Sequence, residues 1–291
     1  MGWKVLKIRL SEEAPAELLS ELSFELSSLG AWEEGREVSL FFVPSVDLPS
    51  RARWAVSFLE ERGLGVLEVE TSEEEARDWI REVREGFCPV EVGPFLVVPP
   101  WHDGPFEGGL LPIRIKPGCA FGTGLHGSTQ AALKLLPRAF EAVRPRRALE
   151  VGVGSGILSI ALLKLGCPEV VGVEIDRNAV EEAEENLRAN GLDGRVALLC
   201  GDMLKPLEEL RFDLLLANLE EGLLLELLEE VRGRGFGGSL LLSGLYGEGQ
   251  LARAVGLLGE MGFEVRARDE SDGWFGVFAS PSSLLRQAGG G

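Results

Sequence analysis

The sequence has few of the residues that build metal centres and disulfide frameworks, with 4 cysteines and 2 histidines among 291 residues. No two cysteines form a CxxC pair, which argues against a disulfide scaffold and a structural zinc site. The cysteines are Cys88, Cys119, Cys167 and Cys200. His102 and His126 are too few for a histidine-rich metal centre. We therefore expect no bound metal.

Long apolar runs are missing as well. Stretches such as residues 214–217 and 223–225 are far shorter than the about 20 residues that a membrane span needs. Near the N-terminus, Lys4, Lys7 and Arg9 interrupt the apolar residues every few positions, unlike in a signal peptide. We therefore expect a cytoplasmic protein with no membrane partner.

Basic residues are scarce relative to acidic ones, 29 against 47, which gives a net charge of −18. Residues 1–93 hold 10 Lys and Arg against 20 Asp and Glu, so this first third of the chain carries −10 of that charge. Such a surface repels a phosphate backbone and attracts a basic partner, although acidity also serves solubility alone. Direct binding of nucleic acid is therefore not expected.

The N-terminal residues predict a small α+β domain. Apolar spacing indicates strands at 3–10, 38–43 and 65–70 and helices at 13–29 and 51–62, an order typical of a ferredoxin-like fold, although no fourth strand is evident. Residues 72–85 begin with an N-cap candidate and three glutamates, which favours a charged helix. We therefore predict a substrate-recognition domain at 1–71, a helical linker at 72–88 and a catalytic domain at 89–291.

The remaining chain predicts an α/β domain. After strands at 95–98 and 111–115, further strands fit at 147–151, 170–174, 196–200, 214–218, 239–243, 263–268 and 274–279, with helices between the first five of these. Such alternation indicates a doubly wound parallel sheet. A short polar turn joins the last two strands, so they must pair antiparallel. The expected fold is a Rossmann-like methyltransferase sheet with an antiparallel last strand.

A glycine loop, Glu150-Val151-Gly152-Val153-Gly154-Ser155-Gly156, follows the first strand of that series. Glycines let a backbone turn sharply and approach a ligand closely, so Gly152 and Gly154 are candidate cofactor contacts. The third glycine comes one residue earlier than in the NAD fingerprint. The spacing instead resembles motif I of class I methyltransferases, whose loop carries the amino-acid part of S-adenosylmethionine.

Glu174 ends the next strand, 18 residues after Gly156. An acid at this position can accept hydrogen bonds from both ribose hydroxyls of a nucleoside. Enzymes that use NAD bind ribose in the same way, and a strand-end carboxylate can also be merely solvated. Glu174 therefore indicates a nucleoside cofactor and does not by itself indicate methyl transfer. Asp202, in the turn after the third strand, is a weaker candidate that could face the adenine.

Asn218 lies at the carboxyl end of the fourth strand, the edge where open α/β sheets bind substrates. Its amide offers a donor and an acceptor to an amine and the cofactor. Methyltransferases of adenine usually have Asn-Pro-Pro and an aromatic residue here. The chain has Asn218-Leu219-Glu220-Glu221, so methylation of nucleic-acid bases is disfavoured.

The string Ala120-Phe121-Gly122-Thr123-Gly124-Leu125-His126, with segments 99–102, 149–160, 172–176 and 217–219, resembles the ribosomal protein L11 methyltransferase family over about residues 75–280. The resemblance implies S-adenosylmethionine as cofactor and methylation of lysine side chains and an N-terminal amine of that protein. It implies cofactor contacts at Thr129, Gly152, Glu174 and Asn218. The Phe121-Gly122-Thr123 loop would cover the methionine end.

Several positions depart from the family pattern. Lys116 stands where an aspartate is usual, Ser128-Thr129 replaces a Thr-Thr pair, Glu150 and Glu174 replace aspartates, and Glu220-Glu221 replaces a mostly apolar pair. Exchange of aspartate for glutamate keeps the charge, whereas Lys116 reverses it near the expected cofactor loop. The substrate protein is therefore less well defined than the cofactor.

We expect Asn218, and His126 as a general base, to be the catalytic residues of a monomeric enzyme that methylates ribosomal protein L11. An aromatic pocket containing Trp101, Phe121 and His126 would help a lysine amine to lose its proton. Three alternatives stay open. The chain could methylate lysine in another protein, methylate a small molecule, or bind a nucleotide without catalysis.

Overall fold

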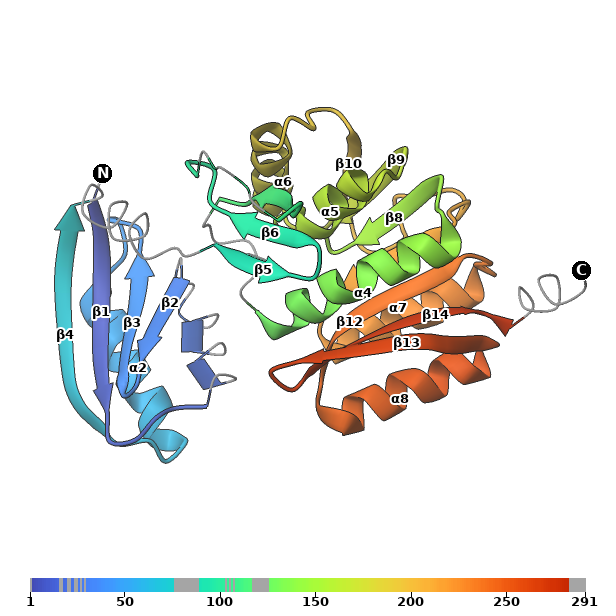
Figure 1. The fold of residues 1–291 in the computed structure, drawn as a ribbon. Coiled ribbons are helices and arrows are strands. Elements are labelled where there is room, and N and C mark those ends of the chain that lie inside the picture. Colours follow the sequence, from blue (N-terminus) through green and yellow to red (C-terminus); the bar gives the residue numbers. More distant parts are fainter. Residues whose placement is uncertain are drawn as a thin grey trace, which may run out of the picture. The chain divides into compact units, whose positions relative to one another are not determined.

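The computed structural model describes residues 2–15, 18–19, 22–23, 26, 28, 30–75, 89–102, 104, 106, 108–116 and 126–282. The chain forms two compact units, Met1–Phe87 and Cys88–Gly291 (Figure 1). No helix in the described part of the chain is long and apolar enough to cross a bilayer. The domain boundaries and functions predicted above for residues 1–71, 72–88 and 89–291 stay predictions. The cytoplasmic location and the monomeric state also stay predictions.

The N-terminal unit contains β1 (Gly2–Leu10), β2 (Gly30–Glu34), β3 (Glu37–Phe42), α2 (Leu48–Glu61) and β4 (Val66–Glu75). The strand pairs in this unit's described residues are antiparallel, and the sheet order β2-β3-β1-β4 is that of the ferredoxin-like fold suggested by the sequence. Alternate residues of β1 and β3, such as Ile8 and Leu40, pack with Phe58 of α2 in one core. Of the helix predicted at 13–29, the described residues 18–19 and 22–23 are helical.

Two features of this unit differ from the prediction. Strand β2 was not predicted from the sequence. Among the described residues it is an edge strand that pairs with β3 through the turn at Gly35, and it has exposed residues such as Trp32. The helix predicted to begin at Ser72 was wrong at its start. Residues 72–75 continue β4 and pair with β1, since glutamates suit an exposed edge strand as well as a first helical turn. Residues 76–88 lie outside the described residues.

The second unit begins with β5 (Val90–Val92), β6 (Phe95–Val98) and β7 (Leu111–Arg114), which form a small sheet in that order. A seven-stranded sheet follows. Its strands are β8 (Arg147–Val151), β9 (Glu169–Glu174), β10 (Val196–Cys200), β11 (Leu214–Asn218), β12 (Ser239–Tyr246), β13 (Phe263–Ser271) and β14 (Trp274–Pro281). Their order is β10-β9-β8-β11-β12-β14-β13, and only the pairs made by β14 are antiparallel. The predicted methyltransferase sheet is confirmed, and β14 inserts between β12 and β13.

Helices cover both faces of this sheet (Figure 1). One apolar core contains residues of α4 (Gly127–Val143), α5 (Ile157–Leu165) and α6 (Arg177–Ala189), and the other contains residues of α7 (Glu221–Gly233) and α8 (Gly247–Glu260). Successive β8 residues alternate between them, Ala148 facing the first core and Leu149 the second. The two cores make the sheet doubly wound. Because β8, β9 and β11 run parallel, their carboxyl ends lie at one common edge of the sheet.

The helix predicted between β10 and β11 is absent, because residues 201–213 form turns and irregular structure. Met203 has a positive φ of 44°, and Pro206 packs directly against Gly201. A left-handed residue and a proline within so short a segment prevent continuous helical hydrogen bonding. Asp202, suggested above as an adenine contact, forms an ion pair with Lys205.

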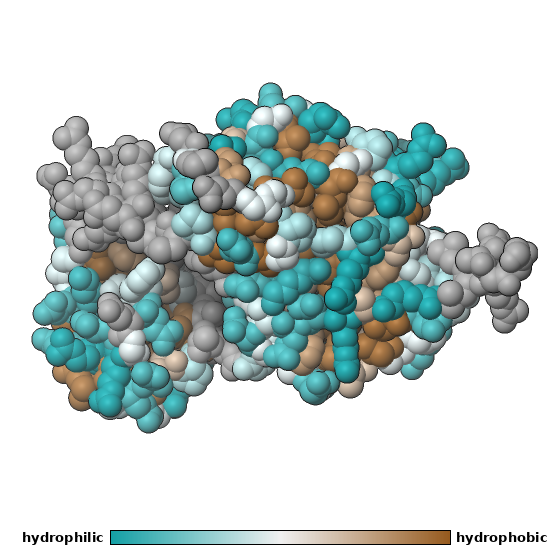
Figure 2. Space-filling view, viewed as in Figure 1, coloured by the Kyte–Doolittle hydropathy of each residue, from teal (hydrophilic) through white to brown (hydrophobic). Residues whose placement is uncertain are grey.

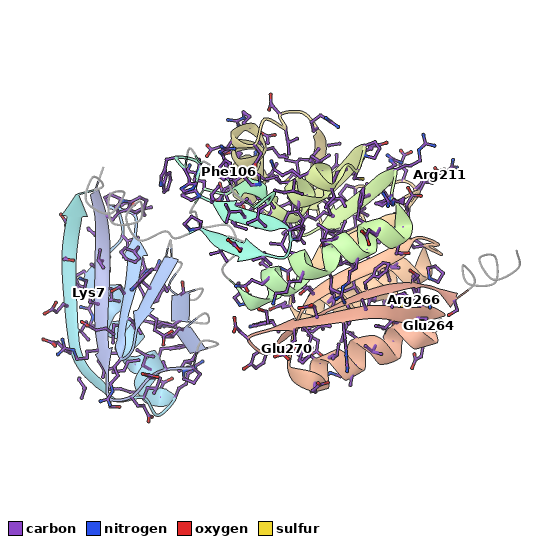
Figure 3. The ribbon with its side chains drawn as sticks, viewed as in Figure 1. Lys7, Phe106, Arg211, Glu264, Arg266 and Glu270 are labelled. Atoms are coloured by element: carbon purple, nitrogen blue, oxygen red, sulfur yellow. The ribbon has the colours of Figure 1, made fainter. Side chains whose placement is uncertain are left out.

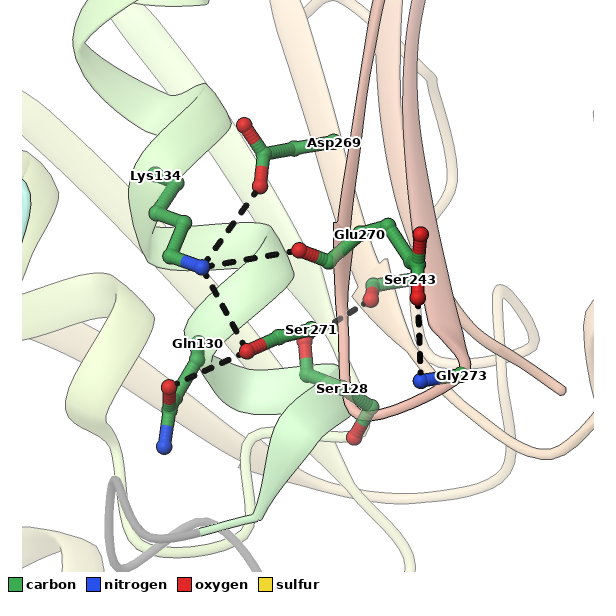
Figure 4. Close-up of polar contacts among 8 residues, drawn as sticks. All are labelled: Ser128, Gln130, Lys134, Ser243, Asp269, Glu270, Ser271 and Gly273. Atoms are coloured by element: carbon green, nitrogen blue, oxygen red, sulfur yellow. Dashed lines mark hydrogen bonds and ion pairs between the residues drawn. The ribbon is translucent and has the colours of Figure 1, made fainter.

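The β13–β14 hairpin is held against α4. Figure 3 shows Glu264 and Arg266 near the beginning of β13 and Glu270 near its turn. At the turn, Lys134 Nζ lies 3.8 Å from Asp269 Oδ1, and Ser271 Oγ donates to Gln130 Oε1 at 3.1 Å (Figure 4). Asp269 and Ser271 of this hairpin are thus tied to Lys134 and Gln130, one turn apart on α4, which fixes the beginning of α4 beside β14.

Candidate active site

The glycine loop lies between β8 and α5, at the carboxyl edge of the sheet. Gly152, Gly154 and Gly156 all have positive φ, 74°, 52° and 79°. Only glycine adopts such a series without strain. The Gly152 N–H donates to the Val173 carbonyl oxygen at 2.9 Å, which ties the loop to β9. The structure therefore confirms a sharp turn at the place predicted for the cofactor, in which Gly152 and Gly154 are half-buried.

Glu174 ends β9 next to that loop and is 9% exposed. Its Oε2 accepts from the Gly154 N–H at 2.9 Å, and its Oε1 accepts from the Asp176 N–H at 3.0 Å. A carboxylate has about four acceptor positions, so both oxygens keep room for another donor. Glu174 thus orders the glycine loop, a role that the sequence did not reveal, and it retains acceptor capacity for ribose hydroxyls.

Ile175, which follows Glu174, is 68% exposed. The carboxyl edge of a parallel sheet is where ligands bind. A large apolar side chain exposed at this edge is therefore placed to contact a ligand. Ile175 was not among the predicted site residues, although its position directly after the strand-end acid is a usable signal.

Asn218 ends β11, and the structure brings it to Thr129 in the first turn of α4. Its Nδ2 donates to Thr129 Oγ1 at 3.3 Å, across 89 positions of sequence. Thr129 is fully buried. Asn218 Oδ1 is also buried, and no described residue donates a hydrogen bond to it. A buried acceptor without a donor is costly, so this oxygen is suited to a ligand N–H.

The adjacent strand supports this pair. Ser243 of β12 is the register partner of Asn218, and its Oγ donates to the Ser128 carbonyl oxygen at 2.8 Å (Figure 4). Ser243 and Ser128 are both fully buried. The beginning of α4 is therefore fixed over the ends of β11 and β12, which holds Thr129 within reach of Asn218.

His126 caps α4 and belongs to a small aromatic cluster. Its Nδ1 accepts from the Ser128 N–H at 3.3 Å. Its ring centroid lies 4.6 Å from that of Trp274, which lies 5.1 Å from that of Tyr246. Burial lowers the pKa of His126, and the charge of Asp272 opposes this. Since Nδ1 serves the helix cap, a general base would have to use Nε2, and that role stays a prediction.

The turn after Asn218 is packed between two glycines. Gly244, with a φ of 94°, lies so close to the Leu219 backbone that a Cβ there would overlap the Leu219 carbonyl oxygen. The Leu219 side chain in turn contacts the place where Gly152 would carry a Cβ. Leu219 therefore connects the end of β11 with the glycine loop, and the absence of both side chains makes the connection possible.

Other residues singled out from the sequence have these positions. Lys116 Nζ pairs with Glu185 Oε2 at 2.7 Å, and Glu221 forms a two-point ion pair with Arg253, so Lys116 and Glu221 both have partners of opposite charge. Trp101 is half-buried, in the segment between β6 and β7. Phe121, Gly122 and Thr123 lie outside the described residues, and their cofactor roles stay predictions.

Glu150 lies in β8, two residues before Gly152, and is 2% exposed. Ser159 of α5 donates to its Oε2. Burial, with a smaller contribution from the negative charge of Glu174, raises the pKa of Glu150 to about 8, and the hydrogen bond from Ser159 opposes this rise. The carboxyl group is therefore held mainly as the neutral acid at neutral pH.

We predict that Glu150→Gln stabilises the protein in a pH-dependent way. The folded chain keeps a proton that the unfolded chain releases above its pKa of 4.5, so the contribution of Glu150 to stability falls as pH rises from there to about 8. Glutamine does not titrate. The free energy of unfolding of the variant should therefore exceed that of the wild type by on the order of 1–3 kcal/mol at about pH 8 and by little near pH 4.5. Thermal unfolding across this range measures it. Glu260→Gln, at an exposed position, is the control. A difference in Tm that is the same at every pH would contradict the prediction.

Comparison with known proteins identifies the family. Residues 29–280 match the family model described as ribosomal protein L11 methyltransferase (PrmA). The ribosomal protein L11 methyltransferase of Aquifex aeolicus is 35% identical over 237 residues, which are 80% of this chain and 88% of the relative. The chain belongs to the ribosomal protein L11 methyltransferase family. The family that the sequence resembled is thereby confirmed, and the chain is an S-adenosylmethionine-dependent protein methyltransferase.

Two further relatives of this methyltransferase agree. The ribosomal protein L11 methyltransferase of Thermus thermophilus is 39% identical over 197 residues, 67% of this chain and 68% of that one. A crystal structure of ribosomal protein L11 methylase from Lactobacillus delbrueckii subsp. bulgaricus superimposes with a TM-score of 0.61 at 31% identity. It covers 67% of this chain and 99% of that one.

The described residues of the methyltransferase fit S-adenosylmethionine. The glycine loop turns sharply beside Glu174, Glu174 retains acceptor positions, and Asn218 Oδ1 is a buried acceptor without a donor among the described residues. All three lie at the ends of neighbouring strands β8, β9 and β11. The edge of the sheet therefore carries a carboxylate and an amide with open acceptor positions, and their roles toward the cofactor and the amine stay predictions.

Proposed function

We propose that this chain methylates amino groups of ribosomal protein L11, namely lysine side chains and the N-terminal amine. The observation that carries the proposal is the buried Asn218 Oδ1 at the end of β11, for which no described residue provides a donor. S-adenosylmethionine supplies an electrophilic methyl group on a sulfonium sulfur. The remaining requirement is to hold a neutral amine in line with it.

The arrangement around Asn218 meets that requirement. Thr129 Oγ1 accepts from Asn218 Nδ2, which directs Asn218 Oδ1 and fixes the amide orientation. An acceptor oxygen binds an amine through its N–H and leaves the lone pair free for the methyl group. A lysine amine with a pKa of about 10.4 must first lose its proton, and at pH 7 this costs about 3.4 pKa units, roughly 4.6 kcal/mol of free energy. The rings of His126, Trp274 and Tyr246 would offer an apolar wall that favours the neutral amine.

Purified ribosomal protein L11 and labelled S-adenosylmethionine test the substrate directly. We expect label in L11, and peptide mass spectrometry should place it on lysines and on the N-terminal amine. Label in a different protein of an extract, with none in L11, would support a lysine methyltransferase of another substrate. Label only in small molecules would contradict protein methylation altogether.

The acidic N-terminal unit is proposed as the substrate reader. The visible surface of this unit is mainly hydrophilic (Figure 2), and charged pairs such as Arg9–Glu68 lie on its sheet. A surface of net negative charge attracts a basic protein, and salt screens that attraction. Added salt and removal of residues 1–87, the first compact unit, should both raise the KM for L11 while the Kd for S-adenosylmethionine is retained. Unchanged methylation after the truncation would contradict this role.

Glu174→Ala should weaken binding of S-adenosylmethionine by about 1–3 kcal/mol. The substitution removes the acceptor for ribose hydroxyls and also releases the Gly154 N–H. Isothermal titration calorimetry measures the Kd. Glu181→Ala, on the same unit but 70% exposed in its side chain, is the matched control. An unchanged Kd in Glu174→Ala would show that the carboxylate does not bind the cofactor.

A further inference from the structure

Two asparagines of α6 hold the backbone that leaves β7. Asn190, the C-cap of α6, accepts from the Arg114 N–H at 2.9 Å and donates to the Arg114 carbonyl oxygen at 2.7 Å. Two residues further along the strand direction, the Lys116 N–H donates to Asn186 Oδ1 at 2.8 Å. The side chains of α6 thus replace a neighbouring strand, since they bind alternate residues of an extended backbone.

Asn186 differs from Asn190 in its second hydrogen bond. Its Nδ2 donates to the Ser155 carbonyl oxygen in the glycine loop at 2.9 Å. Asn186 is fully buried, so water could not replace a hydrogen bond that its amide or its partners lost. One amide therefore joins the glycine loop to the segment after β7 across 31 and 70 positions of sequence.

The carbonyl that Asn186 binds sets the orientation of the loop. The Ser155 carbonyl and the Gly156 N–H share one peptide plane. That N–H donates to the Val153 carbonyl oxygen at 2.9 Å, so the plane is fixed at both ends. On the other side of Ser155, the Gly154 N–H is held by Glu174. Without Asn186, the plane between Ser155 and Gly156 would lose the hydrogen bond that holds its carbonyl end.

We propose that Asn186 is a positioning residue for S-adenosylmethionine. It orders the glycine loop before the cofactor binds, and the Lys116 N–H orients the amide so that Nδ2 faces Ser155. Preorganisation of this kind raises affinity because the loop loses less conformational freedom on binding. The inference rests on the proposed function only through the cofactor. If the wild-type protein does not bind S-adenosylmethionine in the same titrations, the proposed function fails. If the wild type binds it and Asn186→Asp binds it equally well, only this inference fails.

Asn186→Asp separates the two hydrogen bonds. The carboxylate can still accept from Lys116, but it has no hydrogen for the Ser155 carbonyl oxygen and repels it. We expect the Kd for S-adenosylmethionine, measured by calorimetry at about pH 8, to rise on the order of tenfold. Burial raises the pKa of the introduced acid, and its protonated form regains a donor. The ratio of variant to wild-type Kd should therefore shrink as pH falls to about 5.5.

Asn190→Asp is the matched control, on the same helix and the same segment but without a bond to the glycine loop. Its Kd should stay near that of the wild type at every pH. If the two variants weaken binding equally, or if the Asn186→Asp ratio does not change with pH, the proposal is wrong. Should Asn186→Asp fail to fold, Asn186→Ser replaces it, because the shorter side chain reaches neither partner. The expected result is then a weaker Kd with no recovery at low pH, and an unchanged Kd would overturn the proposal.

Discussion

Gly244→Ala should nearly abolish methyl transfer and lower stability by about 2–5 kcal/mol. Gly244 has a φ of 94°, which alanine adopts only with strain, and the added Cβ would overlap the Leu219 carbonyl oxygen. Backbone cannot rotate away as a side chain can. The Leu219 N–H also donates to the Ser243 carbonyl oxygen at 3.2 Å, so the turn is held where the overlap occurs.

The displaced turn begins at Asn218, and a shift of about 1 Å in a positioning group can lower turnover about 10²-fold. Thermal unfolding and steady-state kinetics measure the two effects. Gly247→Ala is the control for backbone strain alone, because Gly247 has a φ of 72° with nothing within 4 Å of the place of a Cβ. It should cost about 1–2 kcal/mol and leave activity nearly intact. Equal effects of the two substitutions would show that the contact with Leu219 has no part in the site.

Asn218→Ala should lower kcat about 10²-fold while costing at most about 1 kcal/mol in S-adenosylmethionine binding. The substitution removes Oδ1, which we propose accepts from the substrate amine. Steady-state methylation of L11 gives kcat, and calorimetry gives the cofactor Kd. Comparable losses in both would make Asn218 a cofactor ligand only.

Thr129→Val separates the orientation of the amide from its presence. Valine keeps the shape of threonine but lacks the Oγ1 that accepts from Asn218 Nδ2. Turnover should fall to a value between those of the wild type and Asn218→Ala, since the amide remains but can rotate. If Thr129→Val retains full turnover, the hydrogen bond between these residues does not direct catalysis.

Much of the site was visible in the sequence because its signals are local. The spacing of Gly152, Gly154 and Gly156 after a buried strand defines a loop that only glycines can form, and the structure confirms their positive φ. Glu174 and Asn218 each follow an apolar run that had to be a strand, so their place at one sheet edge followed from parallel topology. The family string near His126 added the cofactor and the substrate.

The contacts between these residues were decided by the tertiary structure. The acceptor of the Asn218 amide, Thr129, is 89 positions away, and no periodicity brings them together. The ring cluster of His126, Trp274 and Tyr246 arises because β14 inserts between β12 and β13, an order that strand patterns do not specify.

By itself, the sequence determined the type and direction of the main strands, the glycine loop and the acids and amide that end those strands, since each depends on neighbours in the chain. It misjudged residues 72–75, which pair with the distant β1, and residues 201–213, where a strained residue prevents a helix. It also missed β2, an exposed edge strand with little apolar pattern. The roles of Asn186 and Gly244 came only from packing. A side chain that joins two distant backbones, or a missing one that lets them approach, leaves no pattern in a single segment.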